Sequence, residues 1–597
     1  MERQTATSNR LLVAAIDFGT TYSGWAFSFK HEFDRDPTKA TTKNWSPGVG
    51  TLVTDKTPTC ILINPDHTFS AFGYDAENRY IHLLADRQHR THYFFRNFKM
   101  TLFKKLGQKL DRNMLLTDLN GKELLAMDVF AMAIKYLAND VLQQANRGIS
   151  GILVPSEIHW VLTVPAIWSD AAKQFMKEAW SKAGLPTERL MVALEPEVAS
   201  LYCLHLPIDK TTDGSDVFIS QFKTGTQYLV LDAGGGTIDI TVHEVHEHNT
   251  LREVRAANGG DWGGIMVDKS FEDFLINLFG VRVMECFKST ETDDWFDLLR
   301  EFESGKRRMS SDTHGRICMR LPVSLNDLYR EVWKRSIQSR IASSMYAGQV
   351  EIIKDKIRVS TDIFVNLFNG SVRHIVAHLK EMMKDEKLTK VNVVLMVGGY
   401  SESHVLQNSI KEAFPNFQVI IPLSAASVVL RGALIFGHTP MAITERVVKY
   451  TYGVDYSTTF KEGLHQEYRR RRYGDSKTDY CYNAFKKYVE HGQVVKTGET
   501  HKKIVFYTTH KNQNKICFNI FASHLKDPLY VDDSGCFRIG KVTIEFAEPD
   551  DKPQRPVSCS MFFGGTEIIV EAEDGKTGRR EISQLQMLIF LVNEHIR

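Results

Sequence analysis

The chemistry of this sequence is concentrated in a glycine turn that follows an aspartate. Leu229–Leu231 is a short apolar run, Asp232 ends it, and Gly234, Gly235 and Gly236 follow after one alanine. Residues without a side chain take so tight a turn most easily, and the turn exposes backbone N–H groups that together bind an anion, most often phosphate. The Asp232 carboxylate would repel a phosphate unless a cation lay between them. The turn therefore predicts a phosphate and a divalent metal ion in one site.

A second copy of this pattern lies near the start of the chain. An apolar run ends at Asp17, and Gly19 and the hydroxyl residues Thr20, Thr21 and Tyr22 follow it. One such hairpin alone is more often an ordinary β-turn. Two in the same order, one in each half of a long region, predict duplicated lobes that hold one nucleotide from both sides. A third glycine turn, at residues 398–399, follows the apolar run 393–397.

The elements that must position these turns alternate along the chain. Strands are expected at 57–63, 159–166 and 190–194, a helix from Ser169, and a long amphipathic helix at 122–144. Residues 207–226 are interpreted as an exposed loop. Strands alternate with helices to about residue 438, which indicates α/β lobes. After Pro440, strand-like segments separated by turns predict an all-β region.

Size and composition exclude several classes of protein. With 597 residues the chain is too long for one core, and roughly two to four domains are expected. The 43% hydrophobic and 24% charged residues fit a soluble globular protein, and a net charge of +2 argues against nucleic acid as a partner. No apolar run approaches the ~18 residues that span a membrane. The motif G-x-x-x-x-G-K-[ST] of P-loop ATPases is absent.

The cysteines and the first residues bear on location. Eight cysteines are scattered without a C-x-x-C pair, which indicates reduced thiols and no zinc site. The first ten residues are polar and are not typical of a secretory signal. A cytoplasmic location is expected.

Six motifs, in family order across residues 11–438, resemble the heat shock 70 kDa protein family of the superfamily that also holds actin and hexokinase. The motifs are Asp17–Ser23, Thr163–Ala166, Ala183–Leu185, Leu194–Ser200, Asp232–Asp239 and Val397–Ser401. The start at Tyr22–Ala26 and the degenerate C-terminal region look most like the divergent heat shock 70 kDa protein 12 branch. The resemblance implies an α/β, two-lobed, duplicated actin-like ATPase fold with four subdomains at 11–440. It implies a β-sandwich-like substrate-binding domain at 441–580. Residues 1–10, before the first domain, are expected to form a disordered tail. A short C-terminal helix at 581–597 would stand where the family has a helical lid.

The resemblance also implies a site for ATP or ADP with Mg²⁺. Asp17 and Asp232 would hold the metal largely through waters, and Lys99 would stabilise the γ-phosphate and the attacking water. Glu195 and Asp239 would position magnesium waters or the nucleophile. The implied phosphate residues are Gly19, Thr20, Thr21, Tyr22, Gly234, Gly235, Gly236, Thr237, Gly263 and Gly264, with Thr237 also counted as catalytic. The implied adenosine residues are Glu303, Lys306, Arg307, Ser310, Gly398, Gly399 and Tyr400.

This set agrees with the chemistry of phosphoryl transfer, which needs charge neutralisation and in-line positioning more than covalent help. Taken singly, Lys99 would more often be a solvated lysine and Glu195 a residue that ends a strand. Only the joint order of the motifs favours the functional interpretation.

Three departures from the family pattern matter. Glu402 stands where the family has a second adenine-stacking arginine, and Ala426 stands where it has an aspartate. The apolar-acidic linker between the domains has no recognisable counterpart, and residues 438–445 occupy its place. Adenine binding is therefore expected to be weaker or differently gated.

The function expected is that of an ATP-binding, chaperone-like protein, a Mg-dependent ATPase that couples nucleotide state to binding of protein partners or client polypeptides through the β domain. One alternative is a nucleotide-sensing adaptor with negligible hydrolysis, because the linker and lid are missing. A third, ranked low, is a small-molecule kinase of the same fold. No membrane span is expected.

Overall fold

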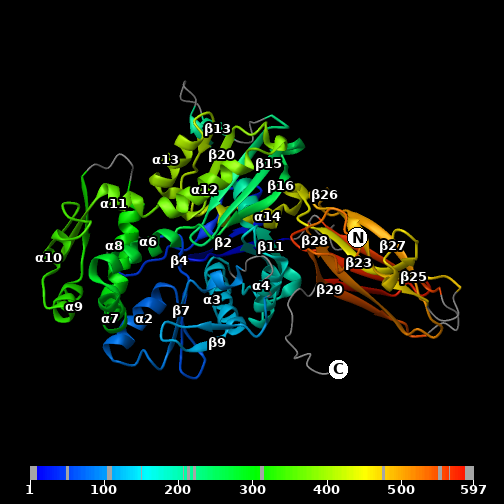
Figure 1. Cartoon of the computed structure of the whole chain (residues 1–597), viewed down its shortest axis with the longest axis horizontal. Coiled ribbons are helices and arrows are strands. Elements are labelled where there is room, and N and C mark those ends of the chain that lie inside the picture. Colours follow the sequence, from blue (N-terminus) through cyan, green and yellow to red (C-terminus); the bar gives the residue numbers. More distant parts are fainter. Residues whose placement is uncertain are drawn as a thin grey trace.

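A computed structural model describes residues 10–48, 53–103, 110–149, 151–205, 207–210, 216–218, 223–309, 315–472, 477–548, 554–563 and 565–584. Two α/β lobes lie against each other, and a strand-rich region lies at one end of the molecule (Figure 1). No helix within these ranges is long and apolar enough to span a bilayer.

The first lobe is built on a six-stranded mixed sheet. β1 pairs in parallel with β10 and antiparallel with β2, so the order is β11-β10-β1-β2-β3, with β4 also pairing with β2. β1 is buried along its whole length, which explains its unbroken apolar run. The strands are β1 Leu12–Phe18, β2 Tyr22–Phe29, β3 Thr41–Thr42, β4 Thr57–Pro58, β10 Ile158–Val164 and β11 Leu190–Leu194.

The second lobe repeats this topology. β14 pairs antiparallel with β15 and in parallel with β20, and the order is β21-β20-β14-β15-β16-β22-β26. Its first five strands match those of the first lobe one for one, which confirms the duplicated actin-like α/β fold. The strands are β14 Gln227–Ala233, β15 Ile238–Val245, β16 Leu251–Gly260, β20 Val393–Val397, β21 Gln418–Ile420, β22 Ile443–Val447 and β26 Val494–Lys496.

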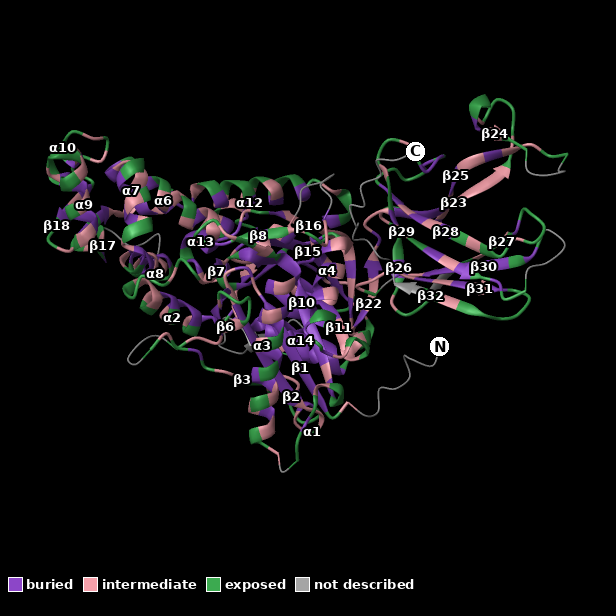
Figure 2. Cartoon of the chain, turned by 90° about the horizontal axis from the view of Figure 1, so that it is seen from below, coloured by how far each residue is buried: buried purple, intermediate pink, exposed green. Residues whose placement is uncertain are grey.

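Two helices between the sheets join the lobes. α5 (Glu195–Cys203) packs on α14 (Val428–His438) so closely that a Cβ at Gly432 would overlap the carbonyl oxygen of Val198. Their apolar faces share one core with residues of both sheets, such as Ala15 and Leu395. Buried residues gather around β1, β10 and α14 (Figure 2). The lobes are therefore coupled through a common interior.

Smaller subdomains extend each lobe. The first lobe adds a sheet of β5 Cys60–Ile63, β6 Phe69–Phe72 and β7 Tyr93–Arg96, the pair β8 Leu115–Thr117 and β9 Glu123–Leu125, and the helices α1 Lys30–Phe33, α2 Tyr74–Ala85, α3 Ala126–Arg147 and α4 Asp170–Lys182. The second lobe adds a sheet of β17 Arg316–Arg320, β18 Val350–Ile353 and β19 Lys356–Ser360. Its helices are α6 Ile265–Phe279, α7 Val281–Thr290, α8 Thr292–Arg308, α9 Val323–Trp333, α10 Ile337–Ala342, α11 Thr361–Asn366, α12 Asn369–Met382 and α13 His404–Ala413.

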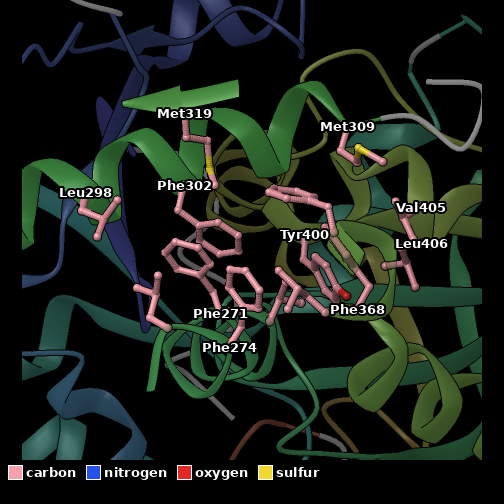
Figure 3. Close-up of a cluster of buried hydrophobic side chains, with 14 of the residues drawn as sticks. Phe271, Phe274, Leu298, Phe302, Met309, Met319, Phe368, Tyr400, Val405 and Leu406 are labelled. Atoms are coloured by element: carbon pink, nitrogen blue, oxygen red, sulfur yellow. The ribbon is translucent and has the colours of Figure 1, made fainter. Parts of the chain in front are cut away.

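An aromatic cluster fixes α6 and α8 in the second lobe. Phe271 and Phe302 stack with ring centroids 3.9 Å apart, and Tyr400 and Phe368 extend the cluster towards β20 (Figure 3). The helices that border the expected adenosine site therefore rest on a rigid base.

The C-terminal region folds as two antiparallel sheets. One has the order β24-β25-β23-β28-β29 and the other β27-β30-β31-β32. Both sheets contribute to one core, as residues such as Ile520 and Met561 show, so the expected all-β sandwich is observed. The strands are β23 Thr451–Thr459, β24 Arg470–Arg471, β25 Tyr480–Val489, β27 Thr500–Tyr507, β28 Lys515–Ser523, β29 Cys536–Glu545, β30 Pro556–Phe562, β31 Ile569–Asp574 and β32 Arg580–Gln584.

The segment between the two domains is itself a strand of the second lobe. β22 pairs in parallel with β16, and β26 from the C-terminal region pairs antiparallel with β22. The boundary expected at residue 441 lies two residues before β22, which belongs to the sheet of the second lobe.

Three local expectations differ from the structure. The helix expected at 122–144 begins only at Ala126, because 123–125 forms β9 against β8. The loop expected at 207–226 contains a pair of strands, β12 Pro207–Lys210 and β13 Asp216–Phe218. Residues 581–584 belong to β32 rather than to a C-terminal helix, because they pair with β31. The remainder of that expected helix, 585–597, and the tail 1–9 lie outside the described residues.

Candidate nucleotide site

The two Asp-Gly turns face each other across the lobes. Each closes a β-hairpin at the end of the first strand of its sheet. A Cβ built on Gly235 would lie 2.9 Å from Thr21 Cβ, and one on Gly236 would lie 2.6 Å from Thr20 Oγ1. The glycines let the opposing turns approach this closely. The two turns, one from each lobe, are therefore in direct contact.

Asp17, at the end of β1, is 4% exposed and fully engaged. Thr163 Oγ1 donates to Oδ1 at 2.9 Å, and Lys56 Nζ lies 2.6 Å from Oδ2. Burial raises the pKa of this carboxyl, but the ammonium groups of Lys56 and Lys99 outweigh it, so the net shift is downwards. Asp17 is therefore held as a carboxylate.

Asp232 lies on the opposite side of the cleft in a different electrostatic state. It is 4% exposed, and its Oδ2 is buried without a hydrogen-bond partner. Burial raises its pKa well above the ordinary value, and the carboxylates of Glu195, Asp239 and Asp17 raise it further. The Lys56 ammonium lowers this pKa but does not outweigh the burial and the three carboxylates, so a further cation beside Asp232 would relieve the repulsion.

Lys99 reaches the cleft from the turn Phe98–Leu102 after β7. The lysine is 1% exposed, and its Nζ donates to Glu195 Oε1 at 2.9 Å and lies 5.0 Å from the ring centre of Trp168. A lysine so deeply buried is not the solvated surface lysine that its sequence position alone would suggest. Glu195 is the first residue of α5, and burial and the nearby Asp17 and Asp239 raise its pKa to about 7, although Lys99 lowers it.

Asp239 lies on β15, directly opposite Asp232 in the hairpin register. Its Oδ1 accepts a hydrogen bond from the backbone N–H of Ile167 at 2.8 Å. Burial raises its pKa to about 6, against the effect of hydrogen bonds from Ile167 and Thr237. Thr237 is buried at the same turn. The sequence-predicted catalytic residues are thus brought together within one buried group.

The glycine pair 263–264 is bound to the triple-glycine turn through the backbone. Gly263 N donates to Gly236 O, and Gly264 N to Gly234 O, both at 3.2 Å. α6 begins at the next residue, so the positive end of a 15-residue helix points to the turn region. The N–H groups of Gly263, Gly264 and Ile265 are thus all bonded to carbonyl oxygens of the turn.

The expected adenosine residues of α8 form an ion-pair chain. Glu303 pairs with Lys306 at 2.6 Å and with Arg307 at 2.8 Å, and Lys306 also pairs with Asp268 at 2.6 Å. The Arg307 guanidinium lies 5.6 Å from the ring centre of Tyr22 in the opposite lobe. The two lobes therefore meet at these residues. Ser310 lies outside the described residues.

The third glycine turn contacts Asp232 directly. Gly398 has φ +85°, and a Cβ there would collide with Asp232 Oδ1, so no larger residue fits. Gly399 faces Ala426, with 3.9 Å between its built Cβ and Ala426 Cβ. The Tyr400 side chain lies in the hydrophobic core beside Phe368, which leaves only its main chain for a nucleotide.

The two departures from the family pattern lie together. The carboxylate of Glu402 accepts a hydrogen bond from the backbone N–H of Ala426 at 3.3 Å. Neither a stacking guanidinium nor a second carboxylate is therefore present at this point, and Glu402 adds negative charge near Arg307.

Lys56 and Trp168 were missed by the sequence interpretation. Lys56 directly precedes β4, and a basic residue before a Thr-Pro strand carries no signal of a site. Trp168 follows the Thr163–Ala166 motif by two residues, and its indole N–H is buried without a partner beside Lys99. A polar atom buried in this way beside the motif is visible only in three dimensions.

The residues fit a cation on one side of the cleft. The orphaned Oδ2 of Asp232 would be satisfied by a metal or a metal-bound water, whereas Asp17 Oδ2 is occupied by Lys56. Among the described residues, no three His, Cys, Asp or Glu side chains form a metal cage.

The chain is similar to known proteins along most of its length. Residues 82–444 match the family described as Hsp70 protein. The chain is 30% identical to human heat shock 70 kDa protein 12B, over 97% of this chain and 91% of that protein. It is 32% identical to human heat shock 70 kDa protein 12A, over 95% and 90%. It is 25% identical to chaperone protein dnaK of Cyanidium caldarium, over 53% of this chain and 46% of that one.

Proposed function

Because the chain belongs to the Hsp70 protein family, with full-length similarity to the heat shock 70 kDa protein 12 branch, we propose that it is a cytoplasmic, chaperone-like protein that binds ATP and ADP with Mg²⁺. Its nucleotide state would control the binding of protein partners or client polypeptides through the β domain. The resemblance identified from the motifs is thereby confirmed, and the family supports a nucleotide-binding, ATPase-fold protein.

One observation carries the proposal. Asp17 and Asp232, from equivalent hairpins of the two lobes, are buried close enough for their charges to interact, together with the ion pair of Lys99 and Glu195. Burial of four carboxylates with two lysines is costly without a ligand. Such clusters of groups with shifted pKa values mark functional sites more often than structural ones.

Each residue has a role that its geometry supports. The glycine turns supply backbone N–H groups for phosphate, and the Lys99 ammonium would hold the terminal phosphate. Glu195, with a pKa near 7, is suited to accept a proton from the attacking water. Mg²⁺ beside Asp232 would supply charge neutralisation for phosphoryl transfer.

Contacts between the domains offer a path from the site to the β domain. Ile167 donates its N–H to Asp239 in the site, and its carbonyl accepts from Lys449 Nζ at 3.3 Å. Lys449 lies between β22 and β23, at the start of the sandwich. Lys177 of α4 also pairs with Glu567 of the sandwich at 2.7 Å. A change at Asp239 would thus be felt by residues that hold the sandwich.

Calorimetric titration with ATP, ADP, GTP and AMP tests the binding. We expect ATP and ADP to bind in MgCl₂. Lys99→Ala should weaken binding by at least tenfold, because it removes the ammonium that would hold the terminal phosphate, and Asp232→Asn should weaken it less, because it removes the carboxylate that would hold the metal ion. Lys182→Ala serves as the control, since its ion pair with Asp128 lies on the outer helices of the first lobe. Unchanged binding in both site variants would contradict the assignment.

The adaptor alternative is favoured by the contact between Glu402 and Ala426, which leaves the adenine side without its stacking pair. It predicts nucleotide binding with hydrolysis near background in a single-turnover assay with purified protein. The kinase alternative predicts phosphate transfer to a sugar and no C-terminal sandwich. The observed sandwich argues against it, and a panel of sugar acceptors tests it.

A further inference from the structure

Lys56 is a cationic residue inside the site that the motifs do not assign. Its Nζ lies 2.6 Å from Asp17 Oδ2, and its side chain is 16% exposed. Gly24 of β2 makes room for the lysine stem, since a Cβ there would lie 2.9 Å from Lys56 Cγ. The ammonium is therefore held against the carboxylate by packing as well as by charge.

The pairing of charges in the cleft is uneven. Lys99 pairs with Glu195, and Lys56 pairs with Asp17. Asp239 accepts a backbone N–H, but Asp232 keeps a buried oxygen without a partner. A divalent ion shared equally by Asp17 and Asp232 would have to displace the Lys56 ammonium. The structure thus offers a metal one free carboxylate and not two.

We propose that Lys56 is a phosphate-binding residue that performs part of the charge neutralisation otherwise left to a divalent cation, so that nucleotide binding persists when Mg²⁺ is removed. The proposal rests on the nucleotide-binding function proposed above. Its ligand class is the polyphosphate of a nucleoside di- or triphosphate.

The chemistry of an ammonium supports this role. A lysine carries three N–H donors and binds phosphate as a point charge. Among the described residues, the Lys56 ammonium makes one hydrogen bond, to Asp17 Oδ2. Its remaining donors would bind a phosphate oxygen placed beside the two turns. Lys56 would then screen that phosphate from Asp17, as a metal ion would.

The first experiment uses Mg²⁺ alone, without nucleotide, and reads thermal unfolding of the full chain. Lys56→Met removes the ammonium, leaves Asp17 buried without its cation, and opens its Oδ2 to a metal. We expect millimolar MgCl₂ to raise the unfolding temperature of this variant by several degrees more than that of the wild-type protein, in which Asp232 alone offers an unpaired carboxylate oxygen. CaCl₂ and NaCl at equal ionic strength report whether the effect belongs to a divalent ion.

Lys43→Met is the matched control. Lys43 Nζ pairs with Asp140 Oδ2 at 2.9 Å, with side chains 27% and 9% exposed. Lys43 directly follows β3, and Asp140 lies on α3 of the same lobe. The Lys43→Met substitution removes a comparable ion pair, and the variant should lose stability for structural reasons only. Its response to MgCl₂ should equal that of the wild-type protein.

The second experiment compares the ATP dissociation constant in MgCl₂ and in EDTA. We expect the dissociation constant in EDTA to be less than tenfold larger than that in MgCl₂ for the wild-type protein and for Lys43→Met. For Lys56→Met we expect this ratio to be at least ten times the wild-type ratio. Lys56→Arg keeps the charge and should return the ratio towards the wild-type value.

Each outcome decides between the two proposals. If removal of Mg²⁺ raises the ATP dissociation constant of the wild-type protein more than a hundredfold, the role of Lys56 is overturned. It is also overturned if the ratio of the two constants is equal in the wild-type protein and in Lys56→Met. Should no nucleotide bind under any condition, the proposed function fails. The response of the variants to MgCl₂ alone still supports or overturns the role of Lys56 in that case. If Lys56→Met does not fold, Lys56→Gln and the wild-type ratio decide.

Discussion

The ion pair between Arg446 and Glu197 should determine whether the β domain stays attached to the lobes. Arg446 lies on β22, and its guanidinium binds Glu197 of α5 with both arms, at 2.7 and 2.6 Å. The two side chains are 9% and 2% exposed. We predict that Arg446→Met releases β22 from the sheet of the second lobe.

The magnitude follows from burial. Removal of one partner of a buried ion pair costs about 3–5 kcal/mol, because the other charge stays buried without compensation. Replacement of both partners by neutral groups costs far less. The double variant Glu197→Gln with Arg446→Met should therefore recover at least about 2 kcal/mol relative to the sum of the single variants.

Hydrogen exchange measures this locally. The backbone N–H of Val447 donates to Glu253 Oε2 at 2.8 Å, so its protection reports the attachment of β22. We expect exchange at β22 to rise about 100-fold or more in Arg446→Met, since each factor of ten corresponds to about 1.4 kcal/mol. Proteolysis between residues 438 and 450 should accelerate in parallel.

Arg555→Met is the control for this experiment. Arg555 and Asp574 form an equally buried, two-armed pair at 2.9 and 2.6 Å, but wholly within the sandwich. This variant should destabilise the sandwich without increased exchange at β22. The reasoning is refuted if Arg446→Met leaves exchange at β22 within threefold of wild type, or if the two single effects simply add in the double variant.

Three further predictions concern pH, the glycine pair and the lobe contact. Burial and the nearby Glu197 raise the pKa of Glu253 to about 8, so the folded state favours the protonated form of this side chain. The free energy of unfolding should therefore fall as pH rises from about 4.5 to 8. Glu253→Gln should flatten this dependence in denaturant unfolding at a series of pH values. Gly263→Ala should lower the stability of the fold by about 1–3 kcal/mol and weaken ATP binding at least tenfold, because its Cβ would lie 2.6 Å from a backbone oxygen of the turn. In Gly264→Ala the new Cβ would lie 3.8 Å from its nearest neighbour, so this variant should bind ATP within about twofold of wild type in the same titration. Arg307→Ala removes the guanidinium over the Tyr22 ring and should lower ATP affinity by about tenfold; equal affinities would show that this contact does not support the nucleotide.

Much of the fold follows from patterns that are local in the sequence. The hairpin after β1 and the one after β14 begin and end where apolar runs, aspartates and glycines indicate, and β11 and β20 have the bounds expected. Boundaries failed where apolar spacing is ambiguous. The leucines at 124–125 continue a helical pattern towards Ala126 but pair with β8 instead, because Leu116 and Leu115, 8 and 10 residues earlier, were available as strand partners.

The candidate site divides in the same way. The sequence order of the motifs places Asp17, Lys99, Glu195, Asp232 and Asp239 as a set, and the structure buries them together. The state of each could not be predicted, because a pKa depends on burial and on neighbours from other elements.

By itself, the sequence determined the duplicated Asp-Gly hairpins, the family and the order of α/β and all-β parts, because these depend on residues within a few positions of one another. Only the tertiary structure decided that Lys56 pairs with Asp17, that Arg446 binds Glu197, and that β22 and β26 extend the sheet of the second lobe. The physical reason is that these contacts join residues 39 and 249 positions apart, whose charges meet only when packing of the whole chain excludes water from between them.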